Sequence, residues 1–248
     1  MIRSLEERIL RPLKGRESDK SSSTIRRIMK VTKGIGVLTV DAYLRYRNVS
    51  KLLAPYMVLD AGAATGSKLS LYREDIKCTS CDLRVGQGVD VVSDVRFLPF
   101  KSKCFDTAAA VDVLEHFPEK FRNIAIKELI RVAKKKVVIH MPLQDNVYFK
   151  GREYDILFSN LYRRIKKRQN TVTEEHLSHH YWSPSYLTEQ NFKLTGTCNT
   201  KVWMTHMTIS YGFPFPLGLW LAWMVYVLFL KWLDNRPPFW GTLAYLNL

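Results

Sequence analysis

Cysteine is scarce in this sequence. Its 248 residues include four cysteines, of which Cys78 and Cys81 form the one closely spaced pair. A structural zinc site needs four ligands, and no second pair of matching spacing accompanies this one. We therefore expect two free thiols on a strand, no metal site, and a reducing, cytoplasmic compartment.

Acidic side chains are also few. The chain has 38 Lys and Arg residues against 23 Asp and Glu residues, and this net charge of +15 favours an anionic partner. Residues 1–50 hold twelve basic and five acidic residues, or +7 of that excess. We expect a basic helical extension there, either a solvated face or a dock for an anionic surface. Residues 1–20 lack the apolar run typical of a cleavable signal peptide.

The stretch that organises the chain is V-L-D-A-G-A-A-T-G, residues 58–66. A short apolar run ends in Asp60, and Gly62 and Gly66 follow, as where a buried parallel strand turns sharply into a helix. About twenty residues later a second strand pattern closes with Asp82, which is placed to accept hydrogen bonds from ribose hydroxyls. A tight turn without a ligand remains an alternative for the glycines alone, and the spacing does not separate NAD from S-adenosylmethionine.

The following segments do separate the two cofactors. Asp94 lies in S-D-V-R-F-L-P-F, and an apolar strand with its turn follows in residues 104–117. A helix that contains Glu128–Val132 and a strand over Val137–Pro142 complete the succession. This order resembles the class I S-adenosylmethionine-dependent methyltransferases of the type 11 subgroup. The resemblance is close over residues 53–142 and looser over residues 174–194.

The resemblance implies an α/β fold with a Rossmann-like, doubly wound, seven-stranded sheet, and S-adenosyl-L-methionine as cofactor. It implies that the glycine turn holds the methionine part of the cofactor. It also implies that Asp82 binds the ribose and that Asp94 binds the adenine amino group. The cofactor-binding residues are then Asp60, Gly62, Ala64, Gly66, Asp82, Leu83, Asp94, Val95 and Asp112. Ala64 stands where the family usually has glycine, which is tolerable if its φ angle is negative.

The segment Asp112–His116 matches the part of the family that faces the transferable methyl group. A hydroxyl acceptor needs a base near neutral pKa, so His116 is our first catalytic candidate, with Asp112 to orient the acceptor and His140 as a second base. Two alternatives to these catalytic roles remain open. His116 could instead pack against the adenine, and His140 could be a buried histidine without a role in catalysis. The tetrapeptides N-P-P-Y and D-P-P-Y, which are typical of amino-group methylation on bases, do not follow strand four.

A histidine cluster follows, with His176, His179 and His180. Adjacent side chains diverge, so the pattern does not favour a metal site. A substrate or proton contact of His176 or His180 remains open beside simple packing. The helix predicted over residues 184–190 has Ser183 as its N-cap and Pro184 at its first position.

Two insertions are expected within a methyltransferase domain of residues 51–248. Residues 143–170 are aromatic and basic, and we interpret them as a lid-like element over the active-site mouth. Residues 207–236 form a hydrophobic insertion, and 207–230 hold no charged residue. Prolines leave about fourteen uninterrupted apolar residues, which favours an interfacial segment over a full span. Its tryptophans suit a headgroup boundary, and a hydrophobic homodimer interface is the alternative.

These observations predict an S-adenosylmethionine-dependent methyltransferase held peripherally or monotopically at a membrane surface. The expected acceptor is a small or lipid-linked molecule, such as a lipid, a quinone-like compound or a glycan-lipid. An RNA or protein methyltransferase is the second hypothesis, although no added RNA-binding module is recognisable. A non-catalytic scaffold with a cofactor fold is the third.

Overall fold

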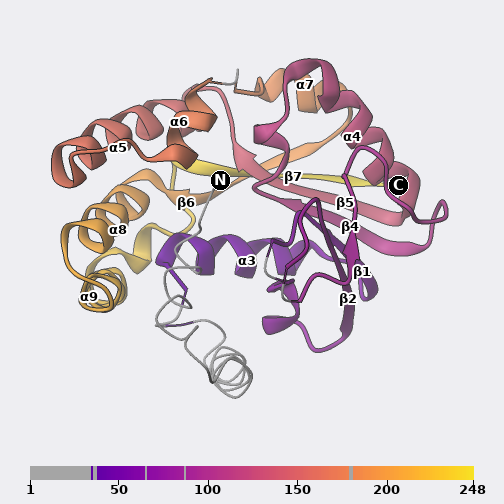
Figure 1. Ribbon diagram of the computed structural model, residues 1–248, viewed down its shortest axis with the longest axis horizontal. Coiled ribbons are helices and arrows are strands. Elements are labelled where there is room, and N and C mark those ends of the chain that lie inside the picture. Colours follow the sequence, from indigo (N-terminus) through magenta and orange to yellow (C-terminus); the bar gives the residue numbers. More distant parts are fainter. Residues whose placement is uncertain (1–34, 36–37, 65, 87, 179–180) are drawn as a thin grey trace.

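The computed structural model describes residues 35 and 38–248, apart from residues 65, 87, 179 and 180. Seven strands form one sheet in the order β3-β2-β1-β4-β5-β7-β6. The first five of these are parallel, and β7 runs antiparallel to β5 and β6. Figure 1 shows helices on both sides of this sheet. The predicted doubly wound, seven-stranded sheet is confirmed.

The strands are β1 (Tyr56–Ala61), β2 (Ile76–Asp82), β3 (Val91–Val92), β4 (Phe105–Val111), β5 (Ala133–Pro142), β6 (Lys193–Asn199) and β7 (Phe239–Asn247). The α-helices are α3 (Val40–Leu52), α4 (Glu119–Val132), α5 (Gly151–Lys166), α6 (Thr171–Ser178), α7 (Pro184–Glu189), α8 (Thr200–Gly212) and α9 (Leu217–Val225). Shorter helical turns are η2 (Leu69–Leu71), η3 (Leu114–His116), η4 (Tyr226–Leu230) and η5 (Lys231–Leu233).

The apolar sequence of the central strands is explained by their burial between helices. Residues 107–111 of β4 are all buried, as expected for a parallel strand covered on both faces. The core pairs this strand with apolar side chains of α4, such as Ile126 and Leu129. Because β1 to β4 are parallel, the residues that follow them emerge along one edge of the sheet. The site described below lies along this edge.

Several boundaries differ from the sequence-based expectation. Helix α3 begins only at Val40, where Thr39 accepts a hydrogen bond from the amide of Ala42, and the rest of the predicted basic extension, residues 1–34, lies outside the described residues. Lys134–Lys136 lie in the first part of β5, and the first two of these lysines are exposed to solvent. Helix α7 is capped by Ser183 as predicted.

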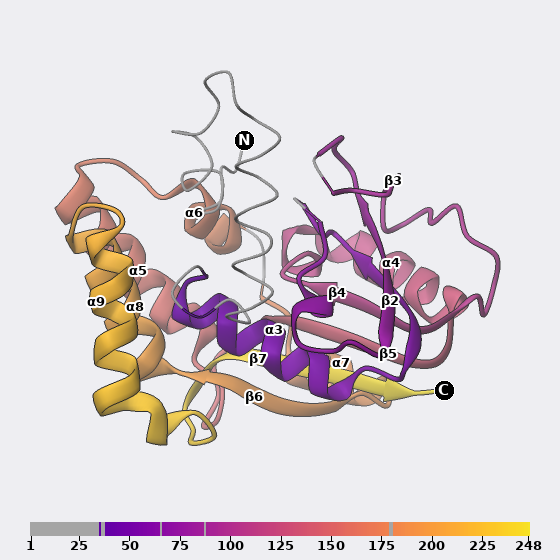
Figure 2. The same ribbon diagram turned by 90° about the horizontal axis from the view of Figure 1, so that it is seen from below.

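The helices α5, α8 and α9 gather at one end of the sheet (Figures 1 and 2). An aromatic core joins them to the strands, since Trp203 of α8 stacks on Trp240 of β7 with ring centroids 4.9 Å apart. The indole of Trp223 in α9 donates a hydrogen bond to the carbonyl of Leu38, at 2.7 Å, which fixes α9 to the start of α3. In the part of the chain that the structure describes, no helix combines the length and the apolar character needed to cross a bilayer.

Candidate active site

The glycine turn after β1 is closed by backbone hydrogen bonds. The amides of Gly62 and Ala63 donate to the carbonyl of Cys81, at 2.7 and 3.0 Å, and tie the turn to the end of β2. Gly62 has a φ angle of +85° and Gly66 one of +97°. A Cβ atom on Gly62 would lie 2.1 Å from a methyl group of Val113, so a larger residue has no room there. Glycine is therefore required by conformation and by space.

Ala64 departs from the expectation. Its φ angle is +48°, whereas the sequence-based argument required a negative value. A non-glycine residue in this left-handed region is strained by roughly 1–2 kcal/mol. The strain is held in place because the Ala64 amide donates to Asp82 Oδ2 at 2.9 Å. The turn therefore keeps the shape of a glycine-rich loop although one glycine is missing.

A carboxylate lies at the carboxyl end of each of the first two strands. Asp60, in β1, is buried, and burial raises its pKa, opposed by a hydrogen bond from Ser67 and the charge of Lys68. Asp82 closes β2 and also accepts from the amide of Arg84, at 3.0 Å. Leu83 follows it with an exposed side chain. Both acids lie at the carboxyl edge, where ligands bind in open parallel sheets.

The acid after β3 has a partner that the sequence did not reveal. Asp94 accepts from the backbone amide of Arg96 at 2.9 Å and from its guanidinium at 3.0 Å. These hydrogen bonds lower the pKa of Asp94. Val95 between them is buried. The arginine lies over the ring of Phe121, 4.7 Å from the centroid, and so orients the carboxylate.

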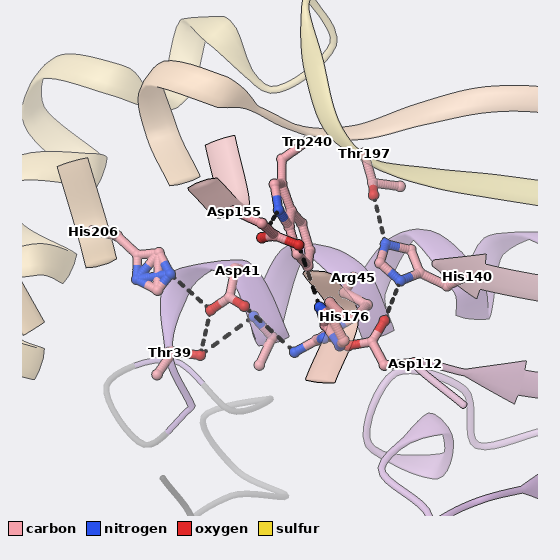
Figure 3. A network of polar contacts seen from close by, with 11 residues as sticks. Thr39, Asp41, Arg45, Asp112, His140, Asp155, His176, Thr197, His206 and Trp240 are labelled. Carbon is pink, nitrogen blue, oxygen red and sulfur yellow. Dashed lines mark hydrogen bonds and ion pairs between the residues drawn. The ribbon is translucent and has the colours of Figure 1, made fainter. Parts of the chain in front are cut away.

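Asp112 connects the edge of the sheet to the helical end of the molecule. It follows β4 with a φ angle of +53° and forms an ion pair with Arg45 of α3. Its Oδ1 also lies 2.6 Å from Nδ1 of His140 in β5, the strand partner of Val111 (Figure 3). The second ring nitrogen of His140 lies 2.8 Å from the hydroxyl of Thr197. Three elements distant in sequence therefore hold one carboxylate.

His140 is the most buried of the three catalytic candidates, with 1% of its surface exposed. Burial lowers its pKa well below the ordinary value, and the charge of Arg45 lowers it further. A neutral ring donates from Nδ1 to Asp112 and accepts the Thr197 hydroxyl proton at Nε2. Because both ring nitrogens of His140 form hydrogen bonds, this arrangement is typical of a histidine that orients a neighbouring side chain, here Asp112.

A second polar group lies between α5, α6 and η3. Asp155 of α5 is buried and accepts from the Tyr181 hydroxyl at 2.6 Å and from the Trp240 indole at 2.9 Å. Its Oδ2 also lies 3.3 Å from Nδ1 of His176 on α6 (Figure 3). The ring of His176 contacts that of His116, with centroids 4.9 Å apart. The lid-like segment thus supplies a residue beside the site.

Burial acts in opposite directions on the acid and the histidine of this group. It raises the pKa of Glu115, which precedes His116 in η3, to about 7, with only partial opposition from His176. It also lowers the pKa of His176, but the hydrogen bond to Asp155 and the negative charges of Asp155, Glu115 and Glu175 together outweigh burial, so that the pKa of His176 is raised overall. His116 itself lies 3.5 Å from Glu175.

The sequence singled out the glycines and acids at the ends of β1, β2 and β3, which we call the cofactor edge. It did not single out several side chains around Asp112, His116 and Asp155, which we call the acceptor side. Arg45, Asp155 and Thr197 reach the site from α3, α5 and β6, and none lies in a local motif. Only the three-dimensional fold brings them together. His179 and His180 lie outside the described residues. Cys78 and Cys81 are free thiols on β2, as predicted, and burial raises the pKa of Cys78 to about 11.

Comparison with known proteins finds a methyltransferase domain in the central part of the chain. The methyltransferase domain family matches residues 59–141, which include the glycine turn, Asp82, Asp94, Asp112 and His140. Residues 59–141 of this chain therefore belong to a methyltransferase domain. A search of curated proteins found no match.

Solved structures support the fold. A possible histamine N-methyltransferase from Thermotoga maritima has 16% identity and a TM-score of 0.50, over 90% of this chain and 97% of that one. A putative methyltransferase from an antibiotic biosynthesis pathway of Anabaena variabilis has 12% identity and a TM-score of 0.50, over 82% and 96%. A putative methyltransferase from Haloferax volcanii, in complex with a methyltransferase activator, has 13% identity and a TM-score of 0.50, over 84% and 89%.

The enzyme's cofactor is S-adenosyl-L-methionine, and the cofactor edge fits it. Gly62 and Gly66 keep the backbone turn free of side chains, and Asp82 retains acceptor capacity for ribose hydroxyls. The cofactor supplies a methyl group that is already activated on a sulfonium. The protein's task is to place an acceptor in line with that group at reactive distance. Which of these residues contact the cofactor stays a prediction.

Proposed function

We propose that this methyltransferase works at an anionic membrane surface on a lipid-linked acceptor. The observation that carries the proposal is the outward face of α9 and the two turns after it. Large apolar side chains there are exposed, and five of them are Trp220, Met224, Leu228, Phe229 and Trp232. Monomeric proteins rarely expose contiguous apolar patches of this kind, which mark interaction sites for proteins or membranes.

The other face of the same segment is well packed. Trp223 and Tyr226 are buried in the aromatic core, and the Tyr226 hydroxyl donates to Asp234 at 2.7 Å. Asp234 in turn lies 3.3 Å from Arg47 of α3. Gly218 lets α9 approach α8 closely, because a Cβ there would lie 2.9 Å from the carbonyl of Ile209. The exposed side chains therefore belong to an anchored element.

The chemistry of the patch favours a lipid surface as the occupant. Trp220 and Trp232 carry the amphipathic rings that prefer headgroup boundaries. Lys231 and Arg236 border the patch, and the Arg236 guanidinium lies 4.9 Å from the ring centroid of Trp232. Basic side chains beside exposed aromatic ones are typical of helices that lie in the plane of an anionic membrane. The net charge of +15 also favours binding to an anionic surface.

Packed aromatic side chains connect the helices that carry the patch to the Asp155 group. Helix α8 precedes α9, and its Trp203 stacks on Trp240, whose indole binds Asp155. An acceptor brought by the membrane would therefore approach the Asp112 and His116 side. Both stay our candidates for orienting the acceptor and removing its proton, and we assign His140 the role of holding Asp112. Asp112 as a cofactor contact remains part of the same proposal.

Vesicle flotation tests the membrane surface. We expect the protein to float with vesicles that contain phosphatidylserine and to float less with purely zwitterionic ones. Because burial of one large apolar side chain contributes about 1.5–3 kcal/mol, the triple variant W220S/F229S/W232S should bind more than about a hundredfold more weakly. The control V85S/V147S removes exposed apolar side chains elsewhere and should float as the wild type does. Equal flotation of both variants would reject the patch as anchor.

Transfer of labelled methyl groups tests the acceptor. Purified enzyme and labelled S-adenosylmethionine are incubated with the lipid, RNA and protein fractions of a cell extract. Label in the lipid fraction supports the proposal. Label confined to RNA or protein would replace it with the second hypothesis. A dimer that loses its association in the triple variant, without any flotation, would assign the patch to a protein interface.

A further inference from the structure

Three side chains beside the site bring metal-binding atoms together. One atom each from Glu115, His116 and His176 lie within 4.8 Å of one another. Glu115 and His116 come from η3, directly after the segment that follows β4, and His176 comes from α6. The spacing of the sequence did not predict this group, because α6 is brought to η3 by the fold.

The acid of this group has an unusual environment. Glu115 has 6% of its surface exposed, and neither carboxylate oxygen accepts a hydrogen bond from another residue that the structure describes. Nε2 of His176 is likewise buried without a hydrogen-bond partner among the described residues. Buried charged groups are normally paired or coordinate a metal ion. The carboxylate of Glu115 and the imidazole of His176 lie close together, and a cation bound between them would satisfy both groups.

The orientation of His176 supports the same conclusion. Its other nitrogen, Nδ1, lies 3.3 Å from Asp155, which is itself held by Tyr181 and Trp240. A proton on Nδ1 leaves the lone pair on Nε2. Metal-binding histidines characteristically donate their second N–H to a carboxylate, which fixes the ring and its tautomer.

We propose that Glu115, His116 and His176 form a binding site for a divalent first-row transition metal ion of the zinc class. Two imidazoles and one carboxylate suit such ions better than magnesium or calcium, which prefer oxygen ligands. Three protein ligands leave a coordination position for water or an acceptor oxygen, as in catalytic zinc sites. With the ion bound, His116 would be a ligand, and Asp112, the other candidate of the proposed function, would accept the proton of the acceptor. The proposal does not depend on a lipid acceptor.

Metal binding to the whole, tag-free protein tests the site. After chelator treatment and dialysis, we expect one saturable Zn²⁺ per chain by calorimetry and elemental analysis, and a higher melting temperature with Zn²⁺. The isosteric variant E115Q and the variant H176N should each lower the Zn²⁺ affinity at least tenfold. The control E119Q removes an exposed carboxylate of α4 and should bind Zn²⁺ as the wild type does.

Two further measurements keep the test decisive if a variant folds poorly. Asp155→Asn weakens the support of His176 and should lower the affinity about 10–100-fold. Bound Co²⁺ should give a visible absorption band that H176N alters. Absence of saturable Zn²⁺ uptake by the wild type would overturn the proposal. So would unchanged Zn²⁺ affinity in E115Q, or an E115Q melting temperature above that of the wild type with no effect of Zn²⁺ on either protein.

Discussion

The cofactor edge and the acceptor side of this enzyme are built differently. The cofactor edge consists of short turns after β1, β2 and β3, closed by backbone hydrogen bonds and by acids that bind amides within a few residues or on the next strand. The acceptor side consists of side chains from α3, α5, α6, β5 and β6 that meet only in the fold. Contacts between residues close in sequence or on adjacent strands therefore determine the geometry of the cofactor edge. Packing between distant elements determines the geometry of the acceptor side.

Substitution of Gly62 should give the largest effect, and it should be confined to the cofactor edge. In Gly62→Ala the new Cβ would lie 2.1 Å from Val113, at a φ angle of +85°. We expect the affinity for S-adenosylmethionine to fall by more than about a hundredfold, or nearly 3 kcal/mol. Isothermal calorimetry measures it. Gly212→Ala is the matched control, since a Cβ there meets nothing within 4 Å. Equal affinities of the two variants would contradict this view of the turn.

Substitution of Asp155 should separate the two regions. Asp155→Ala leaves buried donors of Tyr181 and Trp240 without their acceptor, so we expect a loss of about 3 kcal/mol of stability. For a chain of this size the melting temperature should fall by about 6–12 °C. Cofactor affinity of the folded variant should stay within about twofold of the wild type, because additivity holds for separate sites. A loss of affinity like that of Gly62→Ala would mean that the regions are one unit.

Restoring the family glycine should sharpen the account of the cofactor edge. Ala64→Gly relieves the positive φ angle of +48°, so the protein should gain about 1 kcal/mol of stability. Thermal unfolding should show a rise of about 2–4 °C. A fall in melting temperature would mean that the alanine methyl group makes a contact worth more than the strain.

The pH dependence of stability should report on the acceptor side. His206 of α8 is buried 2.8 Å from Asp41 of α3, near Arg45, and burial lowers its pKa below the ordinary 6.5. The unfolded chain then binds a proton that the folded chain refuses, so stability falls as pH falls below about 6.5. Melting temperatures at pH 7.5 and 5.5 should drop less in His206→Asn than in the wild type. An equal drop would exclude His206 as a contributor.

The same comparison explains what could be predicted from sequence. The central strands and the acids at their ends follow from apolar runs and from Gly62, Gly66 and Asp82, which act on their own neighbours, whereas the seven-stranded sheet came from the resemblance to a known family. The ion pair of Arg45 with Asp112 could not be predicted from the sequence, because the two residues are 67 positions apart, from 45 to 112. The sign of φ at Ala64 depends on a hydrogen bond to Asp82 that only the coordinates reveal. Glu115 belonged to a recognised segment, but its pairing with His176 needed the position of α6.

Cofactor binding is the most direct test of the central claim, that acids at the ends of neighbouring strands form one site for S-adenosylmethionine. Calorimetric titration of the whole chain should show one cofactor per chain. Asp82→Ala should abolish that binding, while the Glu119→Gln protein should keep it. Failure of the wild-type protein to bind the cofactor, or undiminished binding by Asp82→Ala, would contradict the account.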